Sequence, residues 1–298
     1  MTEPARPTSE RIWFAYLGCV AIVAVAVPGG ATPGHDPLAF LLLHAGLAAA
    51  VFASHWLAVH RSHDAARVPR AALAIIGLPA VFSGLCWLLP GVHPEPYELT
   101  FLAFDRTWFG TDAGHLVEAL PPFVVEVLQI CYFAFYGICV ASALAAALGT
   151  GKAAFDRAVL RLVGGFLASY LGYLLVPTLA PKVLLQFEHE VRGLWLTPWL
   201  RTTIDKGEAN PWDCFPSGHT MLTVTAMVSL WQWNRKWFRW LALPAVLLIV
   251  STVLLRYHWT LDVVAGALLA WPVLRLCDWL ADRDGWPRPA ARVTPAGT

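Results

Sequence analysis

The chain has 298 residues, of which 57% are hydrophobic and only 14% are charged. In soluble globular domains roughly a quarter of the residues are charged. This composition therefore excludes an ordinary soluble protein and predicts an integral membrane protein. The net charge of +1 excludes a generally basic surface for nucleic acid, and the six cysteines lack the spacing of a disulfide framework or a thiolate metal site.

Eight apolar stretches are long enough to cross a bilayer, whose apolar core of ~30 Å needs about 20 residues of helix. They cover about residues 12–28, 37–59, 70–90, 119–148, 158–179, 217–234, 238–256 and 259–280. No small-residue cleavage site follows the first stretch, so we expect an anchor rather than a secretory signal. The sequence therefore predicts an all-α polytopic membrane helix bundle with about eight transmembrane helices.

Basic residues are distributed unevenly between the loops. With eight spans, the termini and the even-numbered loops lie on one side, which collects 15 of the 21 Lys and Arg residues. An excess of Lys and Arg in short loops marks the cytoplasmic face. We therefore expect both termini in the cytoplasm of a bacterial-type cell, with the protein in its inner or cell membrane. The loops around Ser217 and Arg256 then face the extracytoplasmic side.

Two long connections between spans carry enough aromatic and apolar residues to lie along the membrane interface. One contains YELTFLAFDRTWFG, at residues 97–110, and the other contains FEHEVRGLWLTPWLRTTI, at residues 187–204. We expect a short amphipathic segment in each.

The chain turns abruptly polar at NPWDCFPSGHT, residues 210–220, just before an apolar run. The pattern predicts Ser217 as the N-cap of the following helix, with free backbone N–H groups beside a glycine that permits close approach. Such a helix start is an anion site. Taken alone, His219 could equally be a capping or interfacial residue.

A second polar group lies in STVLLRYHWTLDVVAG, residues 251–266, where His258 and Asp262 are four positions apart. On a helix this spacing brings both side chains to one face. The carboxylate can then hold one imidazole nitrogen as N–H and leave the other with a lone pair, as a nucleophile or base requires. An H-x-x-x-D pair alone arises often by chance, but two ionisable motifs on one predicted membrane face indicate a functional site.

The combination of PSGHT with a downstream H-x-x-x-D resembles the type 2 phosphatidic acid phosphatase superfamily, from about Asp105 to Gly266. The resemblance implies a six-helix membrane core and a mechanism through a phosphohistidine. Two additional transmembrane helices at residues 1–60 would precede a catalytic domain at residues 61–298.

The resemblance also implies roles for individual residues. His258 would be the nucleophile, Asp262 its orienting partner, and His219 the general acid that protonates the leaving alkoxide. Ser217 and the backbone of Gly218 would bind phosphate oxygens. We expect no cofactor and no metal, because neutral imidazole can attack in line and no H-E-x-x-H or Walker sequence is present.

The sequence departs from the superfamily pattern in two places. The usual K-x6-R-P motif is missing, and VPTLAPK stands in its place, which leaves Lys182 as the candidate phosphate clamp. The S-R that normally opens the last motif reads Ser251-Thr252, so Arg256 is the candidate substitute. Together with FDRTWFG and CYFAFYG, these departures are most similar to the inositol phosphorylceramide synthase branch.

We therefore expect a membrane phosphoesterase or phosphotransferase that acts on a lipid phosphate or phospholipid at the extracytoplasmic face. One alternative is a headgroup transferase that passes a phospho-alcohol, such as phosphoinositol, to a lipid hydroxyl. A non-enzymatic alternative is a lipid-binding or flipping protein with an idle site. The expected partners are the lipid substrate and the bilayer, without nucleic acid, and the oligomeric state stays open.

Overall fold

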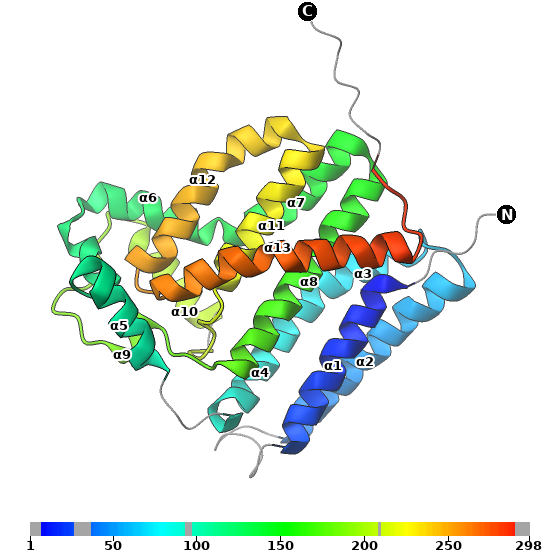
Figure 1. Cartoon of the computed structure of the whole chain (residues 1–298), viewed down its shortest axis with the longest axis horizontal. Coiled ribbons are helices and arrows are strands. Elements are labelled where there is room, and N and C mark those ends of the chain that lie inside the picture. The colour runs from blue at the N-terminus through cyan, green and yellow to red at the C-terminus, as the bar shows by residue number, and fades with distance from the viewer. Residues whose placement is uncertain (1–6, 27–36, 93–96, 208–209, 290–298) are drawn as a thin grey trace, which may run out of the picture.

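The computed structural model describes residues 7–26, 37–92, 97–207 and 210–289. These residues form helices joined by loops, and the only β-type pairing among them is an isolated bridge between Thr178 and Asp213. The prediction of an all-α polytopic bundle is confirmed (Figure 1).

Six helical segments are long and apolar enough to cross a membrane by themselves. They are α1 (Thr8–Ala26), α2 (Pro37–His60), the continuous run of α3, η1 and α4 (Arg67–Ala72, Leu73–Gly77 and Leu78–Val92), α8 (Lys152–Leu175), α12 (Arg235–Leu254) and α13 (Thr260–Arg283). The segment η1 is a π-helical turn just before Pro79, which has no N–H to continue the regular hydrogen-bond ladder.

The two remaining predicted spans differ from straight transmembrane helices. The fourth consists of α6 (Pro122–Phe133) and α7 (Phe135–Thr150), which meet at an angle of 51°. The sixth, α11 (Gly218–Trp233), has only 16 residues, or about 24 Å at ~1.5 Å per residue, which is shorter than the apolar core of a bilayer. Within the described residues the structure thus contains six candidate spans, or up to seven if the bent pair is one span, where the sequence predicts about eight.

Short helices cover one end of the bundle, at the left of Figure 1. They are α5 (Glu98–Phe109), the 3-10 helix η2 (Ala113–Ala119), α9 (Pro181–Leu184) and α10 (Thr197–Gly207). Both segments predicted as short amphipathic pieces therefore contain a helix.

The short helix α11 lies inside the bundle, where it contacts α7, α8, α12 and α13. Met221 and Leu222 of α11 are fully buried in an apolar cluster with Ala226 and with Leu248 of α12. Because its neighbours surround it, the polar start of α11 is held within the bundle.

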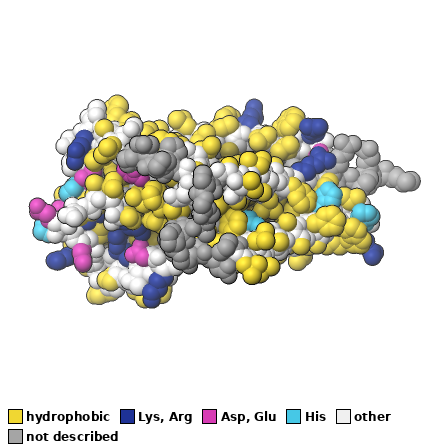
Figure 2. All heavy atoms as spheres, turned by 90° about the horizontal axis from the view of Figure 1, so that it is seen from below, with side chains coloured by type: hydrophobic (Ala, Val, Ile, Leu, Met, Phe, Trp, Pro, Cys, Tyr) yellow, Lys and Arg dark blue, Asp and Glu magenta, His cyan; other side chains and the backbone are white. Residues whose placement is uncertain are grey.

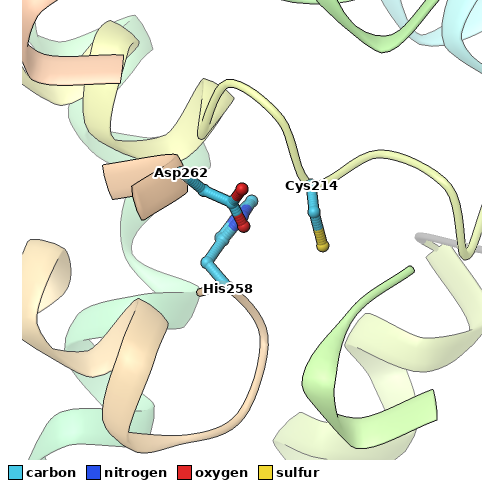
Figure 3. Close-up of side chains that lie close together, drawn as sticks. All are labelled: Cys214, His258 and Asp262. Atoms are coloured by element: carbon cyan, nitrogen blue, oxygen red, sulfur yellow. The ribbon is translucent and has the colours of Figure 1, made fainter. Parts of the chain in front are cut away.

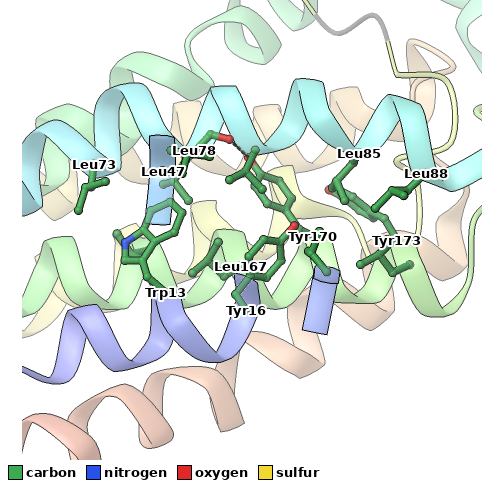
Figure 4. Packing of buried hydrophobic residues seen from close by; sticks show 14 of the residues in the cluster. Trp13, Tyr16, Leu47, Leu73, Leu78, Leu85, Leu88, Leu167, Tyr170 and Tyr173 are labelled. Atoms are coloured by element: carbon green, nitrogen blue, oxygen red, sulfur yellow. Dashed lines mark hydrogen bonds between the residues drawn. The ribbon is translucent and has the colours of Figure 1, made fainter. Parts of the chain in front are cut away.

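The first two helices pack against the rest of the bundle rather than standing apart from it. Trp13 and Tyr16 of α1 share a buried cluster with Leu47 of α2 (Figure 4). The same cluster includes Leu78 of α4 and Tyr170 of α8, and the Tyr170 hydroxyl donates to the Leu78 carbonyl at 3.3 Å. The boundary at residue 60 stays a prediction.

Ion pairs gather at the end of the bundle where α1 begins and α13 ends. They are Arg11–Asp284, Arg67–Asp156, Arg70–Glu10, Arg157–Asp282 and Arg161–Asp278. Hydrophobic side chains dominate the middle of the face in Figure 2, and charged side chains lie toward its ends. The structure thus places the predicted cytoplasmic loops together, while the side of the membrane that they face stays a prediction.

Candidate active site

The loop before α11 is fixed to the start of α13. Ser217 caps α11, since its hydroxyl oxygen accepts from the Thr220 N–H at 3.3 Å, as the sequence predicts. The Ser217 N–H in turn donates to the Asp262 carbonyl at 3.0 Å. Two predicted site segments that are more than 40 residues apart are thereby held against each other.

Gly266 permits this close approach, and Gly218 permits a second one, to Tyr173 of α8. A Cβ atom on Gly266 would lie 2.5 Å from the Ser217 carbonyl oxygen, and one on Gly218 would lie 2.6 Å from the Tyr173 hydroxyl. The first contact is with backbone, which cannot move aside as a side-chain end can. Gly266 is therefore required for α13 to approach the polar loop this closely.

The two predicted catalytic histidines face each other. His258 Nε2 lies 3.4 Å from His219 Nδ1, and the two rings meet edge to face. On the other side of the His258 ring, Nδ1 lies 3.5 Å from Asp262 Oδ2 (Figure 3). Asp262 is fully buried, and the same oxygen accepts from the Trp259 N–H at 2.9 Å. A His258 tautomer with its proton on Nδ1 points this proton toward the carboxylate and leaves the Nε2 lone pair facing His219.

Aromatic rings hold His219 in place. Its imidazole lies against Tyr132 and Phe135, with ring centroids 4.6 and 4.3 Å away, and Tyr132 stacks on Tyr257 at 4.1 Å. Tyr132 and Phe135 flank the bend between α6 and α7 at Ala134. Sequence reasoning assigned no role to these rings, and the CYFAFYG stretch that contains two of them is the one signal that could have found them.

A cavity of about 310 Å³ opens beside the histidines. Both His219 and His258 line it, together with Lys182, Asp205 and Asp213. Lys182 Nζ lies 2.5 Å from Asp205 and 4.4 Å from the centre of the Tyr257 ring. The structure therefore brings Lys182 to the same cavity as the histidine pair, while its role as a phosphate clamp stays a prediction.

Arg256 lies next to this site in sequence but does not line the cavity. Its guanidinium donates to the carbonyls of Gly114 and His189 at 3.0 and 2.7 Å and pairs with Glu118 at 2.7 Å. It also packs 3.6 Å from the centre of the Phe187 ring, and burial lowers its pKa. These contacts tie together the two connections that precede α6 and α10, while the role of Arg256 in phosphate binding stays a prediction.

Buried carboxylates position the elements of the site, and the sequence analysis assigned them no such role. Asp105 of α5 accepts from the Thr260 N–H at the first residue of α13 at 3.3 Å, and burial raises its pKa. Glu98 accepts from the Leu179 N–H at 2.7 Å, close to the segment that carries Lys182. Their contacts join residues about 80 to 155 positions apart, which no local pattern reveals.

Glu126 on α6 holds the start of α10. Its carboxylate accepts from four successive backbone N–H groups, at residues 194–197, and from the Thr197 hydroxyl, at distances of 2.5 to 3.1 Å. This helix carries Asp205 to the cavity. Glu126 therefore binds the chain's own backbone and acts as a positioning residue.

Within the described part of the chain, one group of side chains has the composition of a metal site. Ligand atoms of Cys214, His258 and Asp262 lie within 4.8 Å of one another (Figure 3). A cysteine binds a metal ion as the deprotonated thiolate. The Cys214 thiol, however, donates to the Tyr257 carbonyl at 3.4 Å, and burial raises its pKa well above the usual range. These contacts favour a protonated thiol packed beside the imidazole and the carboxylate.

Comparison with known proteins covers the part of the chain that carries the site. Residues 179–286 match the model of the PAP2 superfamily, and this range includes Lys182, His219, His258 and Asp262. An undecaprenyl-diphosphatase from Sulfolobus acidocaldarius is 42% identical over 65 residues, which are 21% of this chain and 31% of that relative. The chain thus matches about a third of the relative's length, and no solved structure matches significantly. Membership of the inositol phosphorylceramide synthase branch stays a prediction.

Proposed function

We propose that the protein is an integral-membrane phosphoesterase or phosphotransferase that acts on a lipid phosphate at the extracytoplasmic face through a phosphohistidine. The observation that carries this proposal is the 3.4 Å approach of His258 Nε2 to His219 Nδ1, with Asp262 on the opposite edge of the His258 ring. The match of residues 179–286 to the PAP2 superfamily supports the same chemistry.

In the first step, the His258 Nε2 lone pair attacks phosphorus as the bond from phosphorus to the leaving oxygen breaks. His219 gives its proton to that oxygen, so the leaving group departs as an alcohol or a phosphate. The carboxylate of Asp262 stabilises the positive charge that develops on the His258 ring. Since 3.4 Å between the two nitrogens leaves no space for phosphorus, the rings separate when the substrate binds.

In the second step, water or a hydroxyl attacks the phosphohistidine. His219, now neutral, takes the proton from the attacking oxygen, and the bond between His258 and phosphorus breaks. Both histidines return to their starting states. The same two residues therefore serve hydrolysis and transfer.

Donors for the phosphate oxygens lie at the start of α11 and on Lys182. The first intrahelical bond of α11 runs from the Met221 N–H to the Ser217 carbonyl, so the N–H groups of Gly218 and His219 precede the helical ladder. We assign these N–H groups, the Ser217 hydroxyl and the Lys182 ammonium to phosphate binding.

The acceptor distinguishes two versions of this function. Similarity to an undecaprenyl-diphosphatase favours water as the acceptor and a lipid diphosphate as the substrate. The presence of Asp205 and Asp213 in the cavity favours a polyhydroxy headgroup, because carboxylates accept hydrogen bonds from hydroxyls and repel phosphate. A headgroup transferase is therefore the second candidate.

Trapping of the phosphoenzyme tests the proposal. Purified protein is quenched with base after brief exposure to a ³²P-labelled lipid phosphate, and base-stable, acid-labile label is mapped to its residue. We expect label on His258 and none in His258→Ala. His115→Ala is the matched control, since His115 also pairs with an aspartate, Asp112, but does not line the cavity.

Three outcomes separate the candidates. Label on another residue, or undiminished turnover in His258→Ala, contradicts the assigned roles. Binding of lipid phosphate without label or turnover supports the non-enzymatic alternative with an idle site. Product analysis with and without inositol then separates hydrolysis, which yields free phosphate, from transfer, which yields a new phosphate ester of the added alcohol.

A further inference from the structure

A second hollow, about 450 Å³ in volume and lined mainly by apolar side chains, adjoins the polar cavity. Its walls come from the α3–η1–α4 run, from α7 and from α8. At one end it includes His219 and Asp213, which also line the polar cavity. We call this second hollow the apolar groove. The proposed reaction centre therefore lies where the apolar groove meets the polar cavity.

The groove extends along most of α8. Its lining reaches from Phe155, near the start of that helix, to Tyr173, near the end. Tyr173 is 18 positions after Phe155, which corresponds to about 27 Å at ~1.5 Å per residue. A bilayer core is ~30 Å thick, so a chain confined to one leaflet is about 15 Å long. The groove is thus nearly twice as long as one leaflet.

We propose that this groove binds one long polyprenyl chain of the substrate, with its phosphate or diphosphate at His219. This inference rests on the proposed function and adds the class of lipid. A two-chain glycerolipid fits poorly, because each acyl chain matches one leaflet and would leave the far half of the groove empty.

One side of the groove is open to the surrounding lipid. Ile75, Tyr136, Val140 and Leu144 line it and are each at least half exposed. A chain can therefore enter sideways from the bilayer without leaving the apolar phase, while its charged end moves toward Lys182 and the start of α11.

Almost all of the groove is built from the part of the chain outside the superfamily match. The match begins at residue 179, whereas the walls named above lie between Ala71 and Tyr173. Only residues at the reactive end, such as Gly218 and His219, belong to the matched range. The part of the chain before the matched range therefore selects the lipid chain, and the matched range carries the chemistry.

A tryptophan placed in the far half of the groove tests the inference. Two contacts join the α3–η1–α4 run to α8: Arg67 pairs with Asp156, and the Tyr170 hydroxyl bonds to the Leu78 carbonyl. The α3–η1–α4 run and α8 therefore lie side by side and run in the same direction. Ala71 lines the groove between these contacts, nearer the Arg67 end and far from His219. The adjacent Ala72 is exposed and does not line the groove, so Ala72→Trp is the matched control.

The measurement is kcat/KM for farnesyl diphosphate, undecaprenyl diphosphate and dioleoyl phosphatidate. Ala71→Trp should lower the ratio of undecaprenyl to farnesyl activity by about tenfold, since it displaces several buried carbon units of the long chain only. Ala72→Trp should keep the wild-type ratio. Equal effects of both variants, an unchanged ratio in Ala71→Trp, or a wild-type preference for phosphatidate would overturn the inference.

A photo-crosslinking arm separates this inference from the proposed function. An undecaprenyl phosphate with a diazirine about 27 Å along its chain from the phosphate, the length of the groove, should label peptides that contain Ala71 or Phe155, whether or not the protein turns the lipid over. Labelling restricted to other surfaces contradicts the groove assignment. Specific labelling without turnover of any substrate instead contradicts the proposed function and leaves the groove in place.

Discussion

Gly266 of α13 lies directly against the carbonyl oxygen of Ser217 at the start of α11, since a Cβ atom at position 266 would be 2.5 Å from that oxygen. Neither residue touches the other through a side chain. The relative placement of His219 and His258 depends on this contact between two backbones, because Ser217 and Gly266 belong to the segments that carry them.

Gly266→Ala should therefore reduce activity although it adds only one methyl group. The backbone must shift, and a displacement of about 1 Å at a reaction centre costs roughly 10²-fold in rate. Gly137→Ala is the control, because no atom lies within 4 Å of a Cβ atom at that position. Initial rates of phosphate release measure the effect, and equal rates in both variants would contradict the importance of this contact.

Asp262→Asn should keep the start of α13 but slow phosphoenzyme formation. An asparagine oxygen can still accept from the Trp259 N–H, while the charge that stabilises a cationic His258 ring is lost. We expect a rate between those of wild type and His258→Ala, with an unchanged melting temperature. Asp262→Ala should lose both rate and melting temperature, so similar melting of the two variants would argue against a role of the bond from the Trp259 N–H in holding the start of α13.

His219→Ala should slow phosphoenzyme formation by roughly 10² to 10⁴, the usual contribution of a general acid. A substrate with a good leaving group, such as an aryl phosphate, should recover most of this loss because its leaving oxygen needs little protonation. The same substrate should not rescue His258→Ala. Rescue of both variants, or of neither, would show that the two histidines do not divide the roles as proposed.

Cys214 should stay unreactive toward iodoacetamide in the folded protein up to about pH 9, the ordinary thiol range. Burial raises its pKa well above that range, so the reactive thiolate is scarce until the pH exceeds the raised value. Mass spectrometry of the Cys214 peptide, with denatured protein as reference, measures the labelling.

Activity should also survive EDTA, because the nucleophile, the general acid and the phosphate donors proposed are all groups of the protein. The Cys214→Ser variant should respond to EDTA as the wild type does. Complete loss on chelation, with recovery on adding one metal, would instead assign a metal to Cys214, His258 and Asp262.

The distribution of basic residues predicts opposite labelling at the two ends of the bundle. Lys206 of α10 and Lys236 of α12 are both exposed. In right-side-out vesicles, an impermeant maleimide should label Lys206→Cys at once and Lys236→Cys only after permeabilisation. The reverse pattern would place the histidines on the cytoplasmic side.

Local patterns in the sequence predict the helices and the chemical groups of the site. The ranges expected for α2 and α12 agree with the structure to within a few residues, and PSGHT correctly predicts the cap at Ser217. Apolar composition does not reveal the 51° bend at Ala134 or the short length of α11, because packing against neighbouring helices determines both.

The sequence predicts Arg256 as a substitute phosphate-binding residue, and this role stays a prediction. Arg256 is two residues from His258, yet its positive φ of 71° and its bonds to Gly114, His189 and Glu118 direct the guanidinium to a distant connection. The contacts of Asp105 and Glu126 were likewise beyond prediction, since they depend on the fold of residues far away along the chain.

The apolar groove and the polar cavity meet at His219 and Asp213, so the proposed reaction would have separate entrances for its lipid and for its acceptor. A lipid would reach the apolar groove by diffusing in the plane of the membrane. Water or a polyhydroxy alcohol would reach the polar cavity from the aqueous side. Each reactant stays in its own solvent until the moment of reaction. On this proposal, a change of acceptor can evolve at Asp205 without altering which lipid the protein binds, and a change of lipid can evolve at Ala71 without altering the acceptor.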